Sequence, residues 1–279
     1  MTKAVVVSGG FDDLRSAQVR FIQEAARLGP VHLLLWSDEQ VRTETGRPPK
    51  FPVEERRYLL GALRYVDRVT VPEAAFDPDT LPEAAAAAAW PSAGWWVVGE
   101  ADDSPGRRAF AAAHGLEYRV IRAAELAGFP AATAVESPAA RSPRRKVIVS
   151  GCFDWFHSGH VRFFEEASAL GDLYAVVGHD ANVRLLKGEG HPLFPQEERR
   201  YLVQAVRYVM QAMVSSGTGW LDAEPEIKAL RPDLYVVNED GDKPEKRAYC
   251  EGNGIEYLVL KRKPKEGLPR RQSTDLRGY

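Results

Sequence analysis

The sequence repeats itself at long range, and this repeat constrains the fold more than any other feature. VSGGFDDLRSAQVRFIQEAARLG begins at Val7, and VSGCFDWFHSGHVRFFEEASALG begins at Val149. Three further pairs follow in the same order: FPVEERRYLLGALRYV with FPQEERRYLVQAVRYV, WWVVGEADDSPGRR with LYVVNEDGDKPEKR, and GLEY with GIEY. Ordered matches of this kind indicate a duplicated domain of about 130 residues, which is an ordinary domain size.

The segment between the two copies has the composition of an exposed connector. Residues 131–145 read AATAVESPAARSPRR, which is small and polar, contains two prolines and lacks apolar periodicity. We therefore predict a first domain at 1–130, a linker at 131–145 and a second domain at 146–279.

Each copy alternates strand and helix patterns. In the second copy, short β-branched runs predict strands at 146–150, 173–178, 234–237 and 257–260. Helical spacing of apolar residues predicts helices at 158–170 and 196–210. Strands and helices that alternate at these lengths favour an α/β fold of two tandem Rossmann-like domains, each a parallel sheet with helices on both faces. Ligands of such sheets bind at the carboxyl ends of the strands.

Composition excludes several functional classes. The chain has 37 Lys and Arg against 39 Asp and Glu, so it carries no strong overall field for nucleic acid or an anionic membrane. Cys152 and Cys250 are too few for a disulfide framework, which favours a reducing compartment. The apolar run at the N-terminus is too short for a signal peptide, and no stretch approaches the ~20 apolar residues of a membrane span. We expect a cytoplasmic protein without nucleic-acid or membrane partners.

The first strand of the second copy is followed by GCFDWFHSGH, a short segment that contains two histidines, a cysteine and an aspartate. His157 and His160 lie three residues apart at a helix start, and Gly159 between them allows a ligand to approach the backbone. The free N–H groups and positive dipole of a helix N-terminus attract anions there. A pair of surface histidines without function is the simpler alternative. The position at the carboxyl end of a strand favours a polyphosphate site.

GCFDWFHSGH resembles the H-x-G-H signature of the nucleotidyltransferase superfamily, especially the cytidylyltransferases of phospholipid head groups and the adenylyltransferase domains of heptose-phosphate enzymes. Two further segments carry the resemblance in the same order. Lys187-Gly188 resembles the family's K-G segment, and FPQEERR at 194–200, which contains Arg199, resembles its E-x-R segment. RQSTDLR at 271–277 resembles its R-x-S-T segment.

The resemblance implies a reaction and a set of site residues. In this family, a phosphate oxygen of the acceptor attacks the α-phosphorus of a nucleoside triphosphate and pyrophosphate leaves. The catalytic residues would be His157, His160, Lys187 and Arg199. The nucleotide-binding residues would be Gly151, Cys152, Phe153, Asp154, Gly159, Asn238, Asp240, Asp242, Arg271, Ser273 and Thr274. Mg²⁺ is expected as the counter-ion of the triphosphate, with no metal site built from protein residues.

Several of these residues have simpler interpretations. Asp154 fixes a turn as readily as it contacts ribose, and Cys152 is more simply a small buried residue. His179 and Asp180 follow the second strand, where they could contact the acceptor or form a loop without function. The basic run 261–265 is either a solvated loop or a cover over the phosphates.

The first copy has lost most of the motif. Arg15, Ala17 and Gln18 stand where the second copy has His157, Gly159 and His160, and Glu44 falls near the position of Lys187. Arg56 still matches Arg199, but no R-x-S-T segment follows.

We therefore expect a non-catalytic first domain. It would serve either as a covalently attached partner in an intramolecular pseudo-dimer, with further homodimerisation possible, or as a regulatory or acceptor-binding module. The tandem arrangement resembles that of phosphoethanolamine cytidylyltransferases, in which the degenerate copy is the second.

Three functions follow from these patterns. The leading hypothesis is transfer of CMP from CTP to a small phosphorylated alcohol or polyol, with release of pyrophosphate. The alternative is an ATP-dependent adenylyltransferase that acts on a sugar 1-phosphate, because RPDLYVVNEDGDKPEKR resembles the corresponding stretch of the heptose enzymes. The third hypothesis is a nucleotide-binding sensor without catalysis.

Overall fold

The computed structural model describes residues 3–82, 94–130, 143–273 and Leu276. Contacts within the chain divide it into two units, Met1–Gly128 and Phe129–Tyr279. Most of the predicted linker, residues 131–142, lies outside the described residues, so its boundaries stay a prediction.

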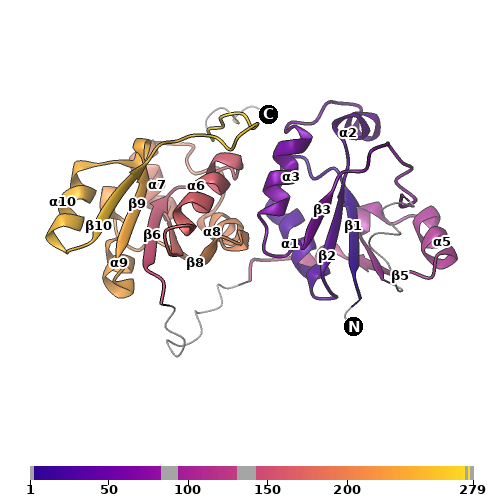
Figure 1. Ribbon diagram of the computed structural model, residues 1–279, viewed down its shortest axis with the longest axis horizontal. Coiled ribbons are helices and arrows are strands. Elements are labelled where there is room, and N and C mark those ends of the chain that lie inside the picture. Colours follow the sequence, from indigo (N-terminus) through magenta and orange to yellow (C-terminus); the bar gives the residue numbers. More distant parts are fainter. Residues whose placement is uncertain (1–2, 83–93, 131–142, 274–275, 277–279) are drawn as a thin grey trace. The chain divides into compact units, whose positions relative to one another are not determined.

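The first unit is a five-stranded parallel sheet in the order β3-β2-β1-β4-β5 (Figure 1). Its elements are β1 (Val5–Gly9), α1 (Ser16–Ala26), β2 (Val31–Leu35), α2 (Asp38–Thr45), α3 (Val53–Gly61), β3 (Arg68–Thr70), β4 (Trp95–Gly99), α5 (Pro105–Ala113) and β5 (Glu117–Ile121).

The second unit repeats this topology, with the strand order β10-β9-β6-β7-β8. Its elements are β6 (Lys146–Gly151), α6 (Ser158–Ser168), β7 (Asp172–Val177), α7 (Asp180–Lys187), α8 (Gln196–Ala205), β8 (Val209–Val214), α9 (Glu224–Leu230), β9 (Leu234–Asn238), α10 (Pro244–Gly252) and β10 (Glu256–Leu260). The two sheets confirm the predicted α/β fold of two tandem Rossmann-like domains.

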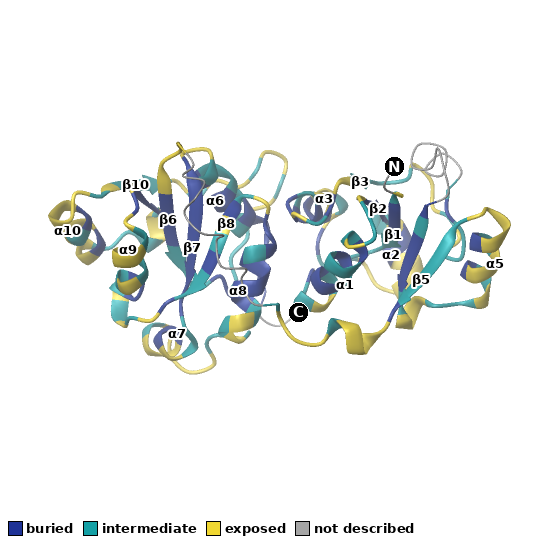
Figure 2. Ribbon diagram, turned by 90° about the horizontal axis from the view of Figure 1, so that it is seen from below, coloured by how far each residue is buried: buried dark blue, intermediate teal, exposed yellow. Residues whose placement is uncertain are grey.

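Burial follows the layers of the second unit. Every residue of β7 is buried, and the strands in the middle of the sheet are far more buried than the outer faces of the helices (Figure 2). Alternate strand residues such as Ile148, Val176 and Val237 pack with Ile227 of α9 and Cys250 of α10. α6 contacts β6 and β7, while α8 contacts β7 and β8. A sheet buried on both faces explains why its strands read as nearly continuous apolar runs.

One predicted helix is shorter in the structure. The helix expected at 196–210 ends at Ala205, and Val209–Val214 forms β8 beside β7. Val206 already has extended backbone, with φ −74° and ψ 128°. The apolar spacing continued past the true end because the following strand is also buried, and pairing with β7 decides between the two conformations.

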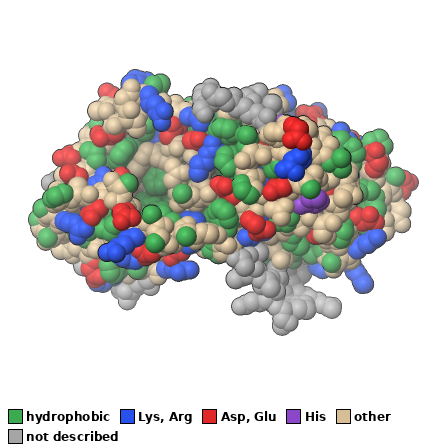
Figure 3. Space-filling model, turned by 180° about the vertical axis from the view of Figure 1, so that it is seen from behind, with side chains coloured by type: hydrophobic (Ala, Val, Ile, Leu, Met, Phe, Trp, Pro, Cys, Tyr) green, Lys and Arg blue, Asp and Glu red, His purple; other side chains and the backbone are tan. Residues whose placement is uncertain are grey.

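Among the described residues, no helix is both long and apolar enough to cross a membrane. On the face shown in Figure 3, acidic and basic side chains are interspersed with apolar ones. This mixture agrees with the near balance of charges in the sequence.

Candidate functional site

The loop after β6 has two residues with left-handed backbone, and it packs closely against Gly151 at the end of the strand. Phe153 and Trp155 have φ of 50° and 46°, in the left-handed region that side chains rarely adopt. The Phe153 ring folds back onto the end of the strand, where a Cβ on Gly151 would lie 2.9 Å from it. Phe11 and Gly9 repeat this contact in the first unit, with φ of 44° at Phe11. Gly151, predicted to bind nucleotide, is therefore required by packing as well.

Asp154 fixes this loop to the segment that precedes α8. Its carboxylate accepts hydrogen bonds from the backbone N–H groups of Leu193 at 2.9 Å and Phe194 at 3.2 Å. In the first unit, Asp12 accepts from the N–H groups of Lys50 and Phe51. Because the copy without the histidines keeps this arrangement, the carboxylate serves the loop structure.

The two histidines of the motif stack at the start of α6. Their ring centroids lie 3.9 Å apart with an interplanar angle of 21°. His157 is fully buried, and its Nδ1 accepts a hydrogen bond from the N–H of Gly159 at 3.0 Å. The proton of the neutral ring therefore lies on Nε2. His157 Nε2 and His160 Nδ1 are both buried without a hydrogen-bond partner in the described part of the chain.

Both imidazoles are held neutral. Burial lowers the pKa of His157 to about 3, and the nearby charges of Arg262 and Arg271 act in the same direction. Burial also lowers the pKa of His160 well below its ordinary value, and His157, Arg262 and Lys187 add to the effect. The pair thus offers neutral N–H donors beside cationic side chains.

The neutral state of His157 predicts a specific pH dependence. Below pH 6.5 the unfolded chain takes up a proton on His157, whereas the folded chain does so only near pH 3. The free energy of unfolding should therefore fall between pH 6.5 and 3, by up to about 1.4 kcal/mol per pH unit. In NMR titrations, the His157 ring signals, assigned through His157→Asn, should not shift between pH 8 and 5. A titration midpoint near 6.5 would contradict this environment.

His160 borders a cavity of about 350 Å³ at the carboxyl edge of the second sheet. Ten of the residues predicted from sequence line this cavity: Gly151, Cys152, Phe153, Asp154, Gly159, His160, Lys187, Asn238, Asp240 and Ser273. Residues far apart in the sequence therefore meet at one edge, as the doubly wound topology requires. The fully buried His157 lies behind His160 and does not line the cavity.

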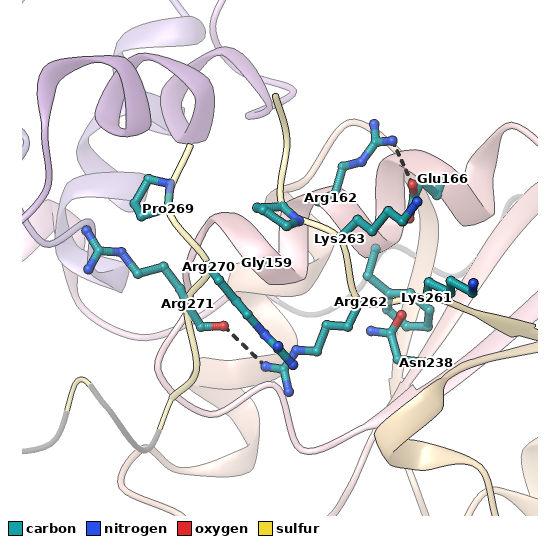
Figure 4. Close-up of a pocket in the computed structure, with 12 residues that line it drawn as sticks. Gly159, Arg162, Glu166, Asn238, Lys261, Arg262, Lys263, Pro269, Arg270 and Arg271 are labelled. Atoms are coloured by element: carbon teal, nitrogen blue, oxygen red, sulfur yellow. Dashed lines mark hydrogen bonds and ion pairs between the residues drawn. The ribbon is translucent and has the colours of Figure 1, made fainter. Parts of the chain in front are cut away.

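A basic hollow adjoins the cavity and shares Gly159, Asn238 and Arg262 with it (Figure 4). Its lining also includes Lys261, Lys263, Arg270 and Arg271, of which only Arg271 was among the predicted site residues. The side chains of Arg262 and Arg270 run toward one another, and Arg262 donates a hydrogen bond to the carbonyl of Arg271 (Figure 4). Converging guanidinium groups of this kind bind phosphates well. Thr274 lies outside the described residues.

Arg199, predicted to be catalytic, is a structural residue. It is 1 % exposed, and its donors bond the carbonyls of Phe194, Cys152 and Gly178 and the carboxylate of Asp180. It does not line the cavity.

Arg56 makes the corresponding bonds in the first unit, to the carbonyls of Phe51, Gly10 and Trp36 and to Asp38. The same bonds occur where the histidines have been lost. The match of EERRY between the copies therefore reflects a shared packing role.

Three other predicted residues also lie outside the cavity lining. His179 caps α7 by accepting from the N–H of Asn182, and its Nε2 contacts the carbonyl of Gly217. Asp180 pairs with Arg199. Asp242 pairs with Arg247 and accepts a hydrogen bond from Tyr257. These side chains form hydrogen bonds and ion pairs with neighbouring residues. A position at the end of a strand does not by itself predict such partners.

The cavity also contains residues that the sequence did not single out: Trp220, Asp222, Lys246 and Arg262. Lys246 is 6 % exposed, its Nζ lies 3.5 Å from Ser150 Oγ, and burial lowers its pKa. Arg262 lies in the basic run 261–265 after β10, and this run was the sequence feature that could have indicated it. The sequence did not indicate Trp220 or Lys246 as site residues. Trp220 lies in a short 3-10 helix, Gly219–Leu221, and Lys246 has the pattern of a solvated helix residue.

Comparison with known proteins gives a consistent assignment. A family model described as Cytidylyltransferase-like matches residues 148–261. FAD synthase of Ferroglobus placidus is 34% identical over 125 residues, which cover 44% of this chain and 78% of that protein. FAD synthase of Thermococcus kodakarensis is 38% identical over 96 residues, covering 34% and 62%.

The bifunctional protein HldE of Methylococcus capsulatus is 39% identical over 104 residues, which cover 37% of this chain. The match spans only 21% of HldE, so most of that protein has no counterpart in it. The H-x-G-H resemblance is confirmed by these matches, and the chain belongs to the cytidylyltransferase-like family of the nucleotidyltransferase superfamily.

Proposed function

We propose that the second unit transfers an adenylyl group from ATP to a phosphorylated acceptor and releases pyrophosphate. The observation that carries the proposal is the neutral, stacked histidine pair at the start of α6, of which His160 lines the cavity together with Lys187 and Arg262. This arrangement supplies hydrogen-bond donors and cations. It therefore suits direct attack by the acceptor phosphate on the α-phosphorus.

The side of the cavity next to Arg262 and Arg270 is suited to the β- and γ-phosphates, since the two guanidinium groups converge there (Figure 4). His160 and Lys187 are then placed for the α-phosphate, where charge develops as pyrophosphate leaves. His157 supports His160 by stacking, and its fixed tautomer holds the pair in one geometry. No group of three His, Cys, Asp or Glu residues in the described ranges could hold a metal ion. We expect Mg²⁺ to arrive with the triphosphate as its counter-ion.

The choice of ATP is supported by the names of the relatives. FAD synthases form a product that contains an adenylyl group, and one of them is matched over 78% of its length. The description of the family model favours CTP as the second candidate donor.

Pyrophosphate release measured with ATP, CTP, GTP and UTP against sugar 1-phosphates, phospho-alcohols and FMN tests the proposal. Release with ATP alone is expected. Release with CTP alone would establish the cytidylyl alternative, and nucleotide binding without release across the panel would indicate a sensor.

Removal of Arg262 should weaken nucleotide binding. Arg262→Ala introduces the residue that the first unit has at the corresponding position, Ala123. Because a phosphate would lose a charge-assisted hydrogen bond, we expect the KM for the nucleoside triphosphate to rise at least tenfold. Arg122→Ala in the first unit is the matched control, and an equal rise there would contradict a phosphate-binding role for Arg262.

A further inference from the structure

The first unit keeps a cavity where the second unit has its site. This cavity measures about 390 Å³, against about 350 Å³ in the second unit. It lies at the carboxyl edge of the first sheet and is bounded by Gly9 of β1, Trp36 after β2 and Gly99 of β4. A volume of this size lies in the range of small-molecule sites.

The cavity has lost the groups that suit a polyphosphate. Gln18 replaces His160, and Ala123 replaces Arg262. Its lining carries two carboxylates, Glu100 and Asp102, against one guanidinium, Arg107. Arg107 lies 3.4 Å from a carboxylate oxygen of Asp79, which offsets its charge. The carboxylates of this cavity would repel a triphosphate, and among the described residues the cavity lacks a counterpart of the basic hollow that adjoins the cavity of the second unit.

The cavity of the first unit carries one aromatic ring at a position where the second unit has none. Phe11 and Phe21 match Phe153 and Phe163 of the second cavity, so the added ring is that of Trp36. Phe11, Phe21 and Trp36 line the cavity, and each is partly exposed. Trp36 stands where the second unit has Gly178, so the first unit has gained a large ring at this strand end. The indole N–H of Trp36 donates to Ser8 Oγ at 3.0 Å, which fixes the orientation of the ring. A fixed aromatic face binds a planar ring well.

The polar groups at the edge of the cavity suit a ligand that has N–H or O–H donors. Glu100 accepts one hydrogen bond from the N–H of Ala123 through Oε2, and its side chain is otherwise exposed. Gln18 accepts from the N–H of Arg15 through its amide oxygen. Its amide NH₂ group therefore supplies donors, while Glu100 and Asp102 supply acceptors.

We propose that the first unit binds a planar heterocycle without phosphate, of the nucleoside class. Its cavity holds the ring against Trp36 and the phenylalanines, and the carboxylates accept from the amino or hydroxyl groups of the ligand. The two units thus use the same strand edge for opposite preferences: the second requires phosphate and the first rejects it.

Calorimetric titration of the full chain with adenosine and cytidine, each compared with its 5′-monophosphate, tests this, with a non-hydrolysable nucleoside triphosphate present throughout to occupy the cavity of the second unit. We expect one nucleoside to bind at least tenfold more tightly than its monophosphate. Trp36→Ala should weaken this binding at least tenfold, whereas Met210→Ala, at an exposed residue of β8 that lines neither cavity, should leave it unchanged.

A second variant guards against loss of the fold. Ala17 is exposed on α1 and lines the cavity, so Ala17→Phe should block binding while the circular dichroism spectrum is retained. The proposal is overturned if neither nucleoside binds, if the monophosphate binds more tightly, or if binding survives both first-unit variants.

Discussion

His160→Ala should lower turnover at least a hundredfold while the second unit stays folded. His160 lines the same cavity as Lys187 and Arg262, where it can donate to charge that develops on the α-phosphate. A preorganised donor of this kind contributes about 2.7–4 kcal/mol to the transition state. The loss should appear in kcat as well as in kcat/KM, because the interaction strengthens in the transition state.

Steady-state pyrophosphate release checks this, with circular dichroism as the test of folding. Arg15→Ala provides the control, since Arg15 stands at the equivalent of His157 in the first unit and pairs with Asp13. Its turnover should stay close to that of the wild type. Turnover of His160→Ala within a few-fold of wild type would remove His160 from the catalytic assignment.

Arg199→Met should lower the free energy of unfolding of the second unit by about 3–5 kcal/mol. The guanidinium satisfies three backbone carbonyls and the Asp180 carboxylate at distances of 2.6–2.8 Å. Methionine fills part of the volume but leaves these acceptors without a donor. Arg56→Met should destabilise the first unit to a similar extent, because its contacts are the same.

Hydrogen exchange followed by mass spectrometry in increasing urea separates the two units. Each variant should lose protection at lower urea within its own unit. If Arg199→Met kept wild-type protection but lost turnover a hundredfold, Arg199 would act on the substrate, as the family motif first implied.

The sequence was sufficient for the architecture because the duplication provides two versions of one pattern. Strand and helix periodicities recur in both copies, and they predicted the parallel sheets. The predicted end of α8 at residue 210 was wrong, because apolar spacing alone does not separate a buried helix from the buried strand that follows it.

The site was predictable where chemistry follows a short motif. The spacing of His157, Gly159 and His160 placed the stacked pair at the start of α6, since a helix N-terminus and a strand end are local features. The sequence also showed that the first copy lacks both histidines. These conclusions depend only on residue type and on nearby positions.

Only the tertiary structure separated structural residues from those that face a ligand. Arg199 and Asp180 carry charges that the sequence reads as functional, yet they are bonded to each other, and Arg199 also donates to backbone carbonyls. Lys246 and Trp220 reach the cavity through helix packing and loop placement. Periodicity shows which residues are buried, but the partner of a buried polar group lies tens of residues away. That partner is fixed only when the strands assemble into a sheet.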